Sequence, residues 1–459
     1  MHSAYMEIVK GLADEAALSI LRKEMSMGEI IIKQGRLVNP ADGTDRVCDI
    51  RISGGRIAEI AEAIPDNIED GKTVIDASGK VVMPGLIDLH VHLREPGFEY
   101  KETIETGTSA AAHGGVTTIC PMPNTNPVID SPERVRDLLE RAENTPVHVL
   151  PVGAVTLGQE GKEIADIRGM KEAGAAALSE DGKSVMDTLV YCKGLREAAE
   201  CGIPVFAHCE DKVLAADGVM NAGKRAEELG LPGITNAVED VIVARDIFLS
   251  KEAGNRLHLC HCSTRDSAAL VDFAKKQGLP VTGEVCPHHF TMSDDEITED
   301  HGRFKMNPPL RGREDVQALK EALRDGVMDV ISTDHAPHAA EEKDQSMLKA
   351  PFGIVGIENS FAISYTELVR GGYLTLSQLI EKMSVNPARV LGIDKGNIAV
   401  GKAADVVIAD LSAEYEIDPD EFFSKGKNTP FAGKKVYGRI EATIVDGRVV
   451  YSAAGGLGK

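Results

Sequence analysis

The sequence predicts an α/β protein built on a (β/α)₈ barrel of the TIM type, with a small β domain beside it. Between residues 81 and 338, short apolar segments alternate with helical segments. The apolar segments are nearly continuous runs of Val, Ile, Leu and Ala, which is typical of parallel strands buried on both faces. The flanking regions instead alternate apolar and polar residues over short stretches, as half-buried antiparallel strands do.

Eight strand candidates can be counted in the central region, and helical stretches separate them. The strands are expected at Leu86–Leu93, Thr117–Met122, Val147–Val155, Ala175–Ser179, Pro204–His208, Leu257–Cys262, Val281–Cys286 and Val330–Thr333. The clearest helices are expected at Ser131–Ala142, Thr188–Cys201, Ala237–Ala253 and Arg265–Gln277. A doubly wound open sheet is the competing topology, but eight βα units favour a closed barrel.

Both ends of the chain are expected to contribute to one small β domain. The turn signals Asp42-Gly43 and Gly54-Gly55 separate short alternating strands before the barrel, and similar strands return after it. We therefore predict a β domain from residues 28–80 and 395–459, and a metal-dependent hydrolase barrel from residues 81–394. Residues 1–27 form a separate N-terminal extension, either a short amphipathic helix or a stretch ahead of a start at Met27.

The composition is that of a globular protein without a nucleic-acid or membrane partner. Hydrophobic residues make up 43% of the chain and charged residues 27%, both ordinary values. The formal net charge of −22 argues against nucleic acid and against an anionic membrane surface. No apolar run reaches the roughly 20 residues that cross a bilayer. Eight cysteines in 459 residues give no disulfide framework, so we expect a reduced, cytoplasmic protein.

Histidines and aspartates recur at the ends of the predicted barrel strands, where the active sites of such barrels lie. His90 and His92 are two residues apart on the first strand, so both imidazoles leave the same face. A single buried histidine is more often a core residue than a ligand. Four further ligand-type residues end later strands, however, and six at one rim predict a metal centre. These four are Asp181, His208, His261 and Asp334.

The six side chains fit two divalent ions that share a carboxylate. His90, His92 and Asp334 would hold one ion and His208 and His261 the other, with Asp181 linking them. A water shared by two such ions is deprotonated near neutral pH. Asp334 could accept its proton and later donate it to a leaving nitrogen. This chemistry hydrolyses an amide-like bond, or forms one by condensation.

A second set of residues is expected to hold an acidic substrate beside the metals. Arg94 lies two residues beyond His92, and its guanidinium suits a carboxylate, although an ion pair with Glu95 is the alternative. Asn124 ends the second strand and offers amide donors, and His338 lies four residues beyond Asp334. Together they predict a small anionic substrate held by its carboxylate.

Other ligand-type residues near these strands are expected to have structural roles. Cys260 and Cys262 flank His261, so on a regular strand both thiols would pack outward, opposite to the imidazole. His288 and His289 end the seventh strand, where the ligand set is already complete. We interpret these two histidines as packing or supporting residues.

Taken with their neighbours, these residues resemble the motifs of class I dihydroorotases in the cyclic amidohydrolase superfamily. The resemblance covers about residues 28 to 451. Its motifs are Asp-Leu-His-Val-His-Leu-Arg-Glu-Pro-Gly at 88–97, Met-Pro-Asn-Thr at 122–125, His-Cys-Glu at 208–210, Cys-His-Cys-Ser-Thr at 260–264, Met-Asn-Pro-Pro-Leu-Arg at 306–311, Thr-Asp-His-Ala-Pro-His at 333–338 and Ala-Pro-Phe-Gly at 350–353.

The resemblance implies an enzyme that reversibly cyclises N-carbamoyl-L-aspartate to L-dihydroorotate in de novo pyrimidine biosynthesis, through a metal-activated hydroxide and an Asp334 proton shuttle. It implies one or two Zn²⁺ ions, two being favoured, on the six ligands named above. It also implies a homodimer, an association with aspartate carbamoyltransferase, and a loop from His338 to Ala350 over the pocket; a solvated surface loop is the alternative. The implied substrate contacts are His92, Arg94, Asn124, Asn307, His338 and the backbone of Phe352 and Gly353.

One motif departs from that family's pattern. Relatives usually carry two aspartates after the fourth strand, whereas this chain has Ser179-Glu180-Asp181-Gly182. We assign the bridge to Asp181, which precedes the glycine and keeps the spacing to His208; Glu180 is the alternative. Residues 175–179 contain no lysine, which favours class I over relatives that use a carboxylated lysine there. A hydantoinase- or allantoinase-type enzyme and a non-catalytic partner of aspartate carbamoyltransferase are the alternative functions.

Overall fold

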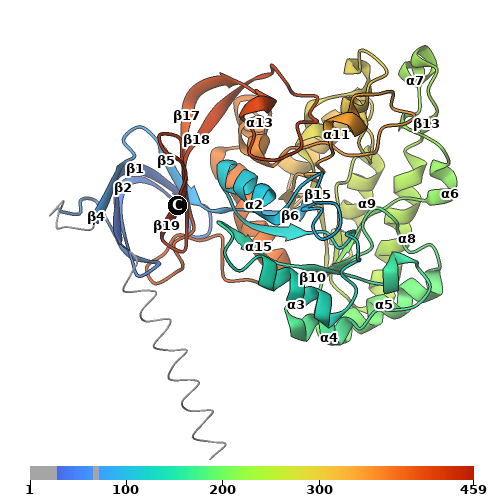
Figure 1. Ribbon diagram of the computed structural model, residues 1–459, viewed down its shortest axis with the longest axis horizontal. Helices are drawn as coiled ribbons and strands as arrows, with labels where there is room; N and C mark the ends of the chain where they lie inside the picture. Colours follow the sequence, from blue (N-terminus) through green and yellow to red (C-terminus); the bar gives the residue numbers. More distant parts are fainter. Residues whose placement is uncertain (1–27, 66–71, 459) are drawn as a thin grey trace, which may run out of the picture.

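The computed structural model describes residues 28–65 and 72–458, in which a β domain lies beside a barrel (Figure 1). The extension predicted for residues 1–27 lies outside the described residues. Among the residues that are described, no helix is long and apolar enough to cross a membrane. The predicted combination of a barrel and a small β domain built from both ends of the chain is confirmed.

A nine-stranded sheet makes up the β domain, in the order β20-β19-β18-β17-β5-β1-β2-β3, with β4 paired to β1. β5 joins the two ends of the chain because it pairs with β1 on one side and with β17 on the other. The boundary predicted at residue 81 falls at the start of β5. The strands are β1 (Glu29–Asn39), β2 (Thr44–Ser53), β3 (Arg56–Ala61), β4 (Lys72–Asp76), β5 (Val81–Pro84), β17 (Val406–Glu416), β18 (Lys435–Val445), β19 (Arg448–Ser452) and β20 (Gly456–Leu457).

Parallel strands form the barrel. Each predicted strand is present, the second shifted by one residue and the others in a shorter form. The predicted third strand is divided in two, because Pro151 interrupts it; its first part pairs with β7 and its second with β10. The ring closes where Val91 forms a parallel bridge with His335. The strands are β6 (Leu86–Val91), β7 (Val116–Pro121), β8 (His148–Val149), β9 (Val152–Ala154), β10 (Ala177–Ser179), β11 (Val205–Ala207), β14 (Leu257–Leu259), β15 (Val281–Val285) and β16 (Val330–Ile331).

Amphipathic helices surround the strands, and the four clearest predictions are confirmed. Their buried faces pack on the outside of the barrel through residues such as Val135, Leu195 and Val271, each 0% exposed. Polar side chains cap several of them; Thr264, for example, accepts a hydrogen bond from the backbone of Ser267. The described helices of ten residues or more are α2 (Ile104–His113), α3 (Pro132–Arg141), α5 (Thr188–Cys201), α8 (Ala237–Ala253), α9 (Arg265–Lys276) and α11 (Arg313–Arg324).

Asp405, next to β17, connects the β domain to the barrel. Its Oδ2 accepts a hydrogen bond from Lys395 Nζ at 2.5 Å, and its Oδ1 lies 3.4 Å from His148 Nε2. The backbone N–H of Asp446 donates to the same Oδ1 at 2.9 Å. Burial alone would raise the pKa of this carboxyl, but the hydrogen bond from His148 and the charge of Lys395 lower it to about 2.

The Asp405 carboxylate is expected to make the free energy of unfolding depend on pH. Because its folded-state pKa is below the unfolded value, its contribution is complete above about pH 4 and is lost as the pH falls towards 2. We expect Asp405→Asn to lower the free energy of unfolding by about 2 kcal/mol at pH 7 and by less at pH 3. Denaturant titrations of both proteins at these two pH values measure this, and an equal loss at both would contradict it.

Candidate active site

Four imidazoles and two carboxylates converge at the C-terminal ends of the barrel strands. His90 lies on β6 and His92 directly after it, while the other four follow β10, β11, β14 and β16. Each of the six is at most 7% exposed. The structure therefore brings together every residue that the sequence predicted as a metal ligand: His90, His92, Asp181, His208, His261 and Asp334.

Asp181 lies between two groups of these side chains. His90 Nε2 is 3.2 Å from Asp181 Oδ1, and His92 Nε2 is 3.6 Å from Asp181 Oδ2. On the other side, His208 Nδ1 and His261 Nε2 lie 3.5 and 3.8 Å from Oδ1. Within each group the possible ligand atoms lie within 4.8 Å of one another. This is the arrangement expected of two metal positions that share one carboxylate.

Asp334 lies on the His90 side of Asp181. Its Oδ1 is 3.0 Å from His92 Nε2 and 3.6 Å from His90 Nε2. Burial would raise the pKa of its carboxyl, but the hydrogen bond with His92 and the charge of His90 lower it. Asp181 behaves in the same way, with its pKa held well below the usual range by His90 and the hydrogen bonds from His208 and His261. Both carboxylates are therefore ionised at neutral pH.

Oxygen acceptors hold three of the imidazoles from behind, on the side away from Asp181. A hydrogen bond at one ring nitrogen fixes the tautomer and leaves the lone pair of the other nitrogen free for a metal. Consistent with this, His90 Nε2 has no hydrogen-bond partner. The donor set therefore fits divalent ions of the zinc type. The three pairs are His90 Nδ1 with Glu284 at 3.2 Å, His92 Nδ1 with Asn124 Oδ1 at 3.0 Å, and His208 Nε2 with Glu210 at 3.1 Å.

Asn124 has contacts beyond those that its predicted role requires. Its Oδ1 contacts His92, and its Nδ2 donates to Asp181 Oδ2 at 2.9 Å. It connects two of the predicted ligands and also lines the adjoining cavity. Glu210, which the sequence placed only in a motif, supports His208 in a similar way and is itself paired with Lys212.

Glu180 points away from the cluster. Its Oε2 accepts hydrogen bonds from the backbone N–H groups of Val155 and Thr156, both at 3.1 Å, and the Thr156 hydroxyl donates to its Oε1. Burial raises the pKa of Glu180 to about 7. Since Asp181 contacts the histidines and Glu180 does not, the geometry favours Asp181 as the bridging carboxylate.

Left-handed backbone conformations mark three residues of this region. Arg94, His261 and Asp334 have φ angles of 62°, 36° and 48°, values that are uncommon for non-glycine residues and that often occur at functional sites. The turn at His261 also corrects one expectation, because it breaks the alternation of the strand. Cys260 lies inside the barrel, with its sulfur within 4.8 Å of ligand atoms of His90 and Glu284, and does not pack outward as predicted.

A cavity of about 180 Å³ opens beside the cluster. It is lined by His92, Arg94, Asn124, Asn307, Phe352 and Gly353, together with most of the metal-type residues. These are six of the seven residues predicted to contact substrate. The seventh, His338, lies behind the wall of the cavity, where its Nε2 is 2.8 Å from the Phe352 carbonyl.

Arg94 brings a cation to this cavity without a carboxylate partner. Its Nε donates to the Pro337 carbonyl at 3.0 Å, and one of its terminal nitrogens is 3.2 Å from His338 Nε2. Within residues 28–65 and 72–458, no ion pair of Arg94 is present. Glu95, the predicted alternative partner, pairs with Arg141 at 3.3 Å and accepts a hydrogen bond from the Ile104 backbone. The guanidinium is therefore available to a ligand carboxylate.

Lys101 sets the tautomer of His338. A lysine ammonium can only donate, and its Nζ is 3.2 Å from His338 Nδ1. Nδ1 therefore accepts, and Nε2 carries the hydrogen that it donates to the Phe352 carbonyl. The contact of Arg94 with Nε2 at 3.2 Å is then not a hydrogen bond, because a guanidinium can only donate. Burial and the neighbouring charges of Arg94 and Lys101 lower the pKa of His338 to about 2, so the ring is neutral. Nothing in the sequence pattern pointed to Lys101.

The loop between His338 and Ala350 is held in place by a buried amine. Lys343 is 3% exposed, and its Nζ donates to the carbonyls of Lys305, Pro351 and Gly353 at 3.0, 2.9 and 2.7 Å. Gly353 has a φ of 130°, and a Cβ there would lie 2.7 Å from Ala336 Cβ, so no other residue fits. The Gly353 N–H donates to Lys305, so both of its backbone polar groups are engaged within the protein.

Removing this amine is expected to destabilise the fold. Lys343→Met removes three hydrogen bonds from a buried ammonium and leaves the Pro351 carbonyl without a donor, at a cost of about 3 kcal/mol in the free energy of unfolding. Lys349→Met, at an exposed position of the same loop, is the matched control and should leave stability unchanged. Chemical denaturation of the three proteins measures the difference. Equal stabilities of the two variants would show that the amine does not hold the loop.

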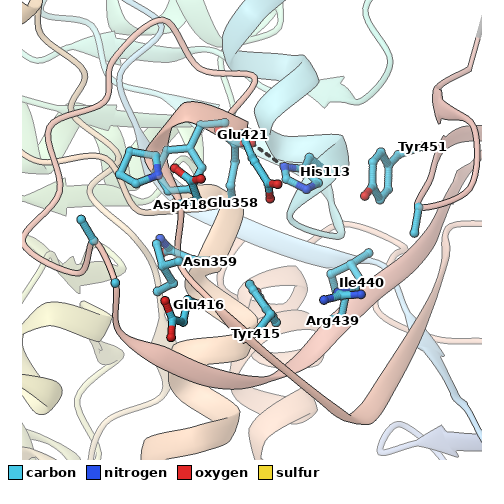
Figure 2. A pocket seen from close by; sticks show the side chains of 16 residues that line it. His113, Glu358, Asn359, Tyr415, Glu416, Asp418, Glu421, Arg439, Ile440 and Tyr451 are labelled. Carbon is cyan, nitrogen blue, oxygen red and sulfur yellow. Dashed lines mark hydrogen bonds and ion pairs between the residues drawn. The ribbon is translucent and has the colours of Figure 1, made fainter.

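A larger cavity lies elsewhere, between η4 (Ile357–Asn359), the end of α2 and the outer halves of β17 and β18 (Figure 2). Its volume is about 740 Å³, and the ion pair of His113 with Glu358 lies in its wall. Among the described residues, the metal-type groups do not include any that line it. Chemistry, and not size, therefore places the candidate active site at the ends of the barrel strands.

Comparison with known proteins agrees with this placement. A family model described as dihydro-orotase-like matches residues 79–267. The dihydroorotase of Bacillus cytotoxicus is 48% identical over 429 residues, which cover 93% of this chain and 99% of that protein. The chain belongs to the dihydroorotase family. Dihydroorotases of Bacillus cereus and Bacillus anthracis match to the same extent, and this family member is therefore a hydrolase of cyclic amides.

Solved structures with the same fold include relatives with other substrates. L-Hydantoinase (dihydropyrimidinase) from Arthrobacter aurescens aligns with a TM-score of 0.83 and 30% identity, over 94% of this chain and 98% of that one. D-Hydantoinase (dihydropyrimidinase) from a Thermus species aligns with a TM-score of 0.81 and 27% identity, over 94% and 97% of the two chains. The barrel and its β domain are thus shared across several cyclic amidohydrolases.

Proposed function

We propose that the chain is a class I dihydroorotase, which reversibly cyclises N-carbamoyl-L-aspartate to L-dihydroorotate. The observation that carries this proposal is the guanidinium of Arg94, which lines the cavity without an ion-pair partner among the described residues. L-dihydroorotate has a carboxylate on its ring, whereas hydantoin, allantoin and dihydropyrimidines have none. Identity to dihydroorotases of 48%, against 30% to a hydantoinase, supports the same substrate.

The proposed metal centre follows from the donor set. His90, His92 and Asp334 would hold one zinc ion, His208 and His261 a second, and Asp181 would contact both. Divalent ions at such positions lower the pKa of water and polarise a carbonyl oxygen. Asn124 and Glu210 orient His92 and His208 towards these positions.

Asp334 is the proposed proton carrier. In ring opening it accepts a proton from the attacking water as the water oxygen bonds to the ring carbonyl carbon, and it returns that proton to the ring nitrogen as the C–N bond breaks. In cyclisation, the carbamoyl nitrogen loses its proton to Asp334 and attacks the protonated side-chain carboxyl group, and Asp334 returns that proton to the departing hydroxyl, which leaves as water. The lowered pKa of Asp334 provides the ionised form that accepts the proton.

The carboxylate of the substrate is proposed to bind Arg94, with its flat guanidinium forming two parallel hydrogen bonds. Asn307 lines the same cavity and is proposed to complete this subsite, while His338 lies against Arg94 behind the cavity wall. Residues 175–179 contain no lysine, which favours the class I subtype over relatives with a carboxylated lysine. The homodimer and the association with aspartate carbamoyltransferase remain predictions.

A parallel assay tests the proposed function. Purified protein of known metal content is incubated separately with L-dihydroorotate, hydantoin and allantoin, and ring opening is followed spectrophotometrically. We expect turnover of dihydroorotate and little or no turnover of the other two rings. Preferred turnover of hydantoin or allantoin would contradict the proposal, and so would a metal-loaded protein that turns over none of the three.

A further inference from the structure

A buried carboxylate beneath the metal-type cluster has no role in the mechanism above. Glu284 lies on β15, inside the barrel, and is 0% exposed. Within the described part of the chain it forms no ion pair with a lysine or an arginine. Its Oε1 is 3.2 Å from His90 Nδ1 and accepts a hydrogen bond from the His261 backbone N–H at 3.2 Å. It therefore contacts two of the strands that carry the proposed ligands.

The second oxygen of Glu284 connects to another imidazole. Its Oε2 is 3.0 Å from Nε2 of His258, which lies on β14 and is 1% exposed. His258 Nδ1 is in turn 2.8 Å from the Thr282 hydroxyl. Both of these residues line a cavity at the N-terminal ends of β11, β14 and β15, at the mouth of the barrel opposite to the cluster. A continuous chain of hydrogen bonds thus runs through the barrel interior from this mouth to His90.

The direction of these hydrogen bonds follows from the chemistry of the groups. A carboxylate can only accept, so His90 must carry its hydrogen on Nδ1 and His258 must carry one on Nε2. The Thr282 hydroxyl can donate or accept and so permits this state of His258. With its hydrogen on Nδ1, His90 presents the lone pair of Nε2 towards Asp181, the side on which that atom has no hydrogen-bond partner.

We propose that Glu284 and His258 are a pair of positioning residues that fix the tautomer and ring orientation of His90 for metal binding. Glu284 supplies the acceptor that holds Nδ1, and His258 supplies the hydrogen-bond partner that makes a buried carboxylate tolerable without a lysine or an arginine. Neither side chain touches the substrate cavity. This inference rests on the metal centre proposed above, but not on the identity of the substrate.

Retention of zinc by Glu284 variants tests the proposal. Zinc-loaded proteins are mixed with a chromophoric chelator, and the metal transferred at equilibrium gives the affinity. We expect Glu284→Met, which offers no acceptor, to weaken zinc binding by about 100-fold, and Glu284→Gln, which keeps a neutral acceptor for His90, to weaken it by about tenfold. An imidazole N–H proton resonance of His90 should be present in the wild-type protein and absent from the Met variant.

Glu180→Gln is the matched control, because Glu180 is also buried near the cluster, but its side chain, among the described residues, bonds only to Val155 and Thr156. It should retain zinc like the wild-type protein. Wild-type affinity in both Glu284 variants would overturn the proposal, and so would equal losses in Glu180→Gln and Glu284→Gln. If Glu284→Met does not fold, the Gln variant decides alone. Failure of the proposed function is distinguishable, since a different preferred substrate would leave these affinities unchanged.

Discussion

Asp334→Asn is expected to lower kcat by about 10²- to 10⁴-fold in both directions of the reaction, the range that a positioned acid–base group contributes. The carboxylate is buried and ionised, and its Oδ1 is 3.0 Å from His92. Asparagine keeps a similar shape and one oxygen donor atom, but it can neither accept nor return the proton. Steady-state rates with dihydroorotate and with N-carbamoyl-L-aspartate measure the loss.

Metal analysis of the same preparation provides the control for this variant. We expect most of the zinc to be retained, because the other five proposed ligands are unchanged. A variant that keeps its zinc and loses turnover supports the proton-carrier role. Substantial activity of the metal-loaded variant across neutral pH would contradict that role.

Arg94→Ala is expected to remove the selection for a carboxylated ring. Loss of one partner from a buried, hydrogen-bonded charge pair costs about 2 to 5 kcal/mol, which corresponds to a fall of about 30- to 5,000-fold in kcat/KM for dihydroorotate. Arg94→Lys should retain only part of the wild-type kcat/KM, since an ammonium lacks the planar pair of donors. Kinetics of the three proteins, each with its zinc content measured, provide the comparison.

Arg141→Ala is the matched control for Arg94. Arg141 forms an ion pair with Glu95, the residue that follows Arg94. The Arg141 side chain is 43% exposed, however, and does not line the cavity. Its removal should leave kcat/KM unchanged. Near-normal dihydroorotate turnover in Arg94→Ala, or an equal loss in Arg141→Ala, would remove Arg94 from the substrate site.

The barrel could be predicted from the sequence because its strands are apolar runs and its helices have a regular period. The positions of the metal-type residues could be predicted for the same reason, since each ends one of those strands. The break between β8 and β9 at Pro151 changed the pairing but not the order of the strands. Continuous apolar runs, and the polar residues at their ends, therefore carried most of the prediction of both the fold and the candidate site.

Where the local backbone departs from a regular strand, the sequence could not predict which way the side chains face. Glu180 and Asp181 are adjacent at a strand end, and only the structure shows that the first bonds to Thr156 and the second to the histidines. Cys260 faces inward together with His258, two residues before it, and the positive φ of His261, which no pattern of residue types predicts, turns that imidazole towards the cluster. In both cases, the direction in which a side chain points depends on the backbone conformation of a single residue at the end of a strand.

Contacts between distant segments were the other part that the sequence could not provide. Glu284 is the one charged residue in the strand Val281-Thr282-Gly283-Glu284-Val285. Its partners His90 and His258 come from other strands. Lys101 meets His338 across 237 residues of sequence. Such supporting residues carry no local signal, because their role exists only after the barrel has closed.

The central claim is that this site selects a ring with a carboxylate, and comparison of two substrates tests it most directly. Dihydroorotate and dihydrouracil have the same ring and differ only in the carboxylate. The measurement is the ratio of their kcat/KM values with zinc-loaded wild-type protein. We predict a preference for dihydroorotate of at least about 100-fold, within the range set by the loss of one buried charge pair. Equal values, or a preference for dihydrouracil, would contradict the account.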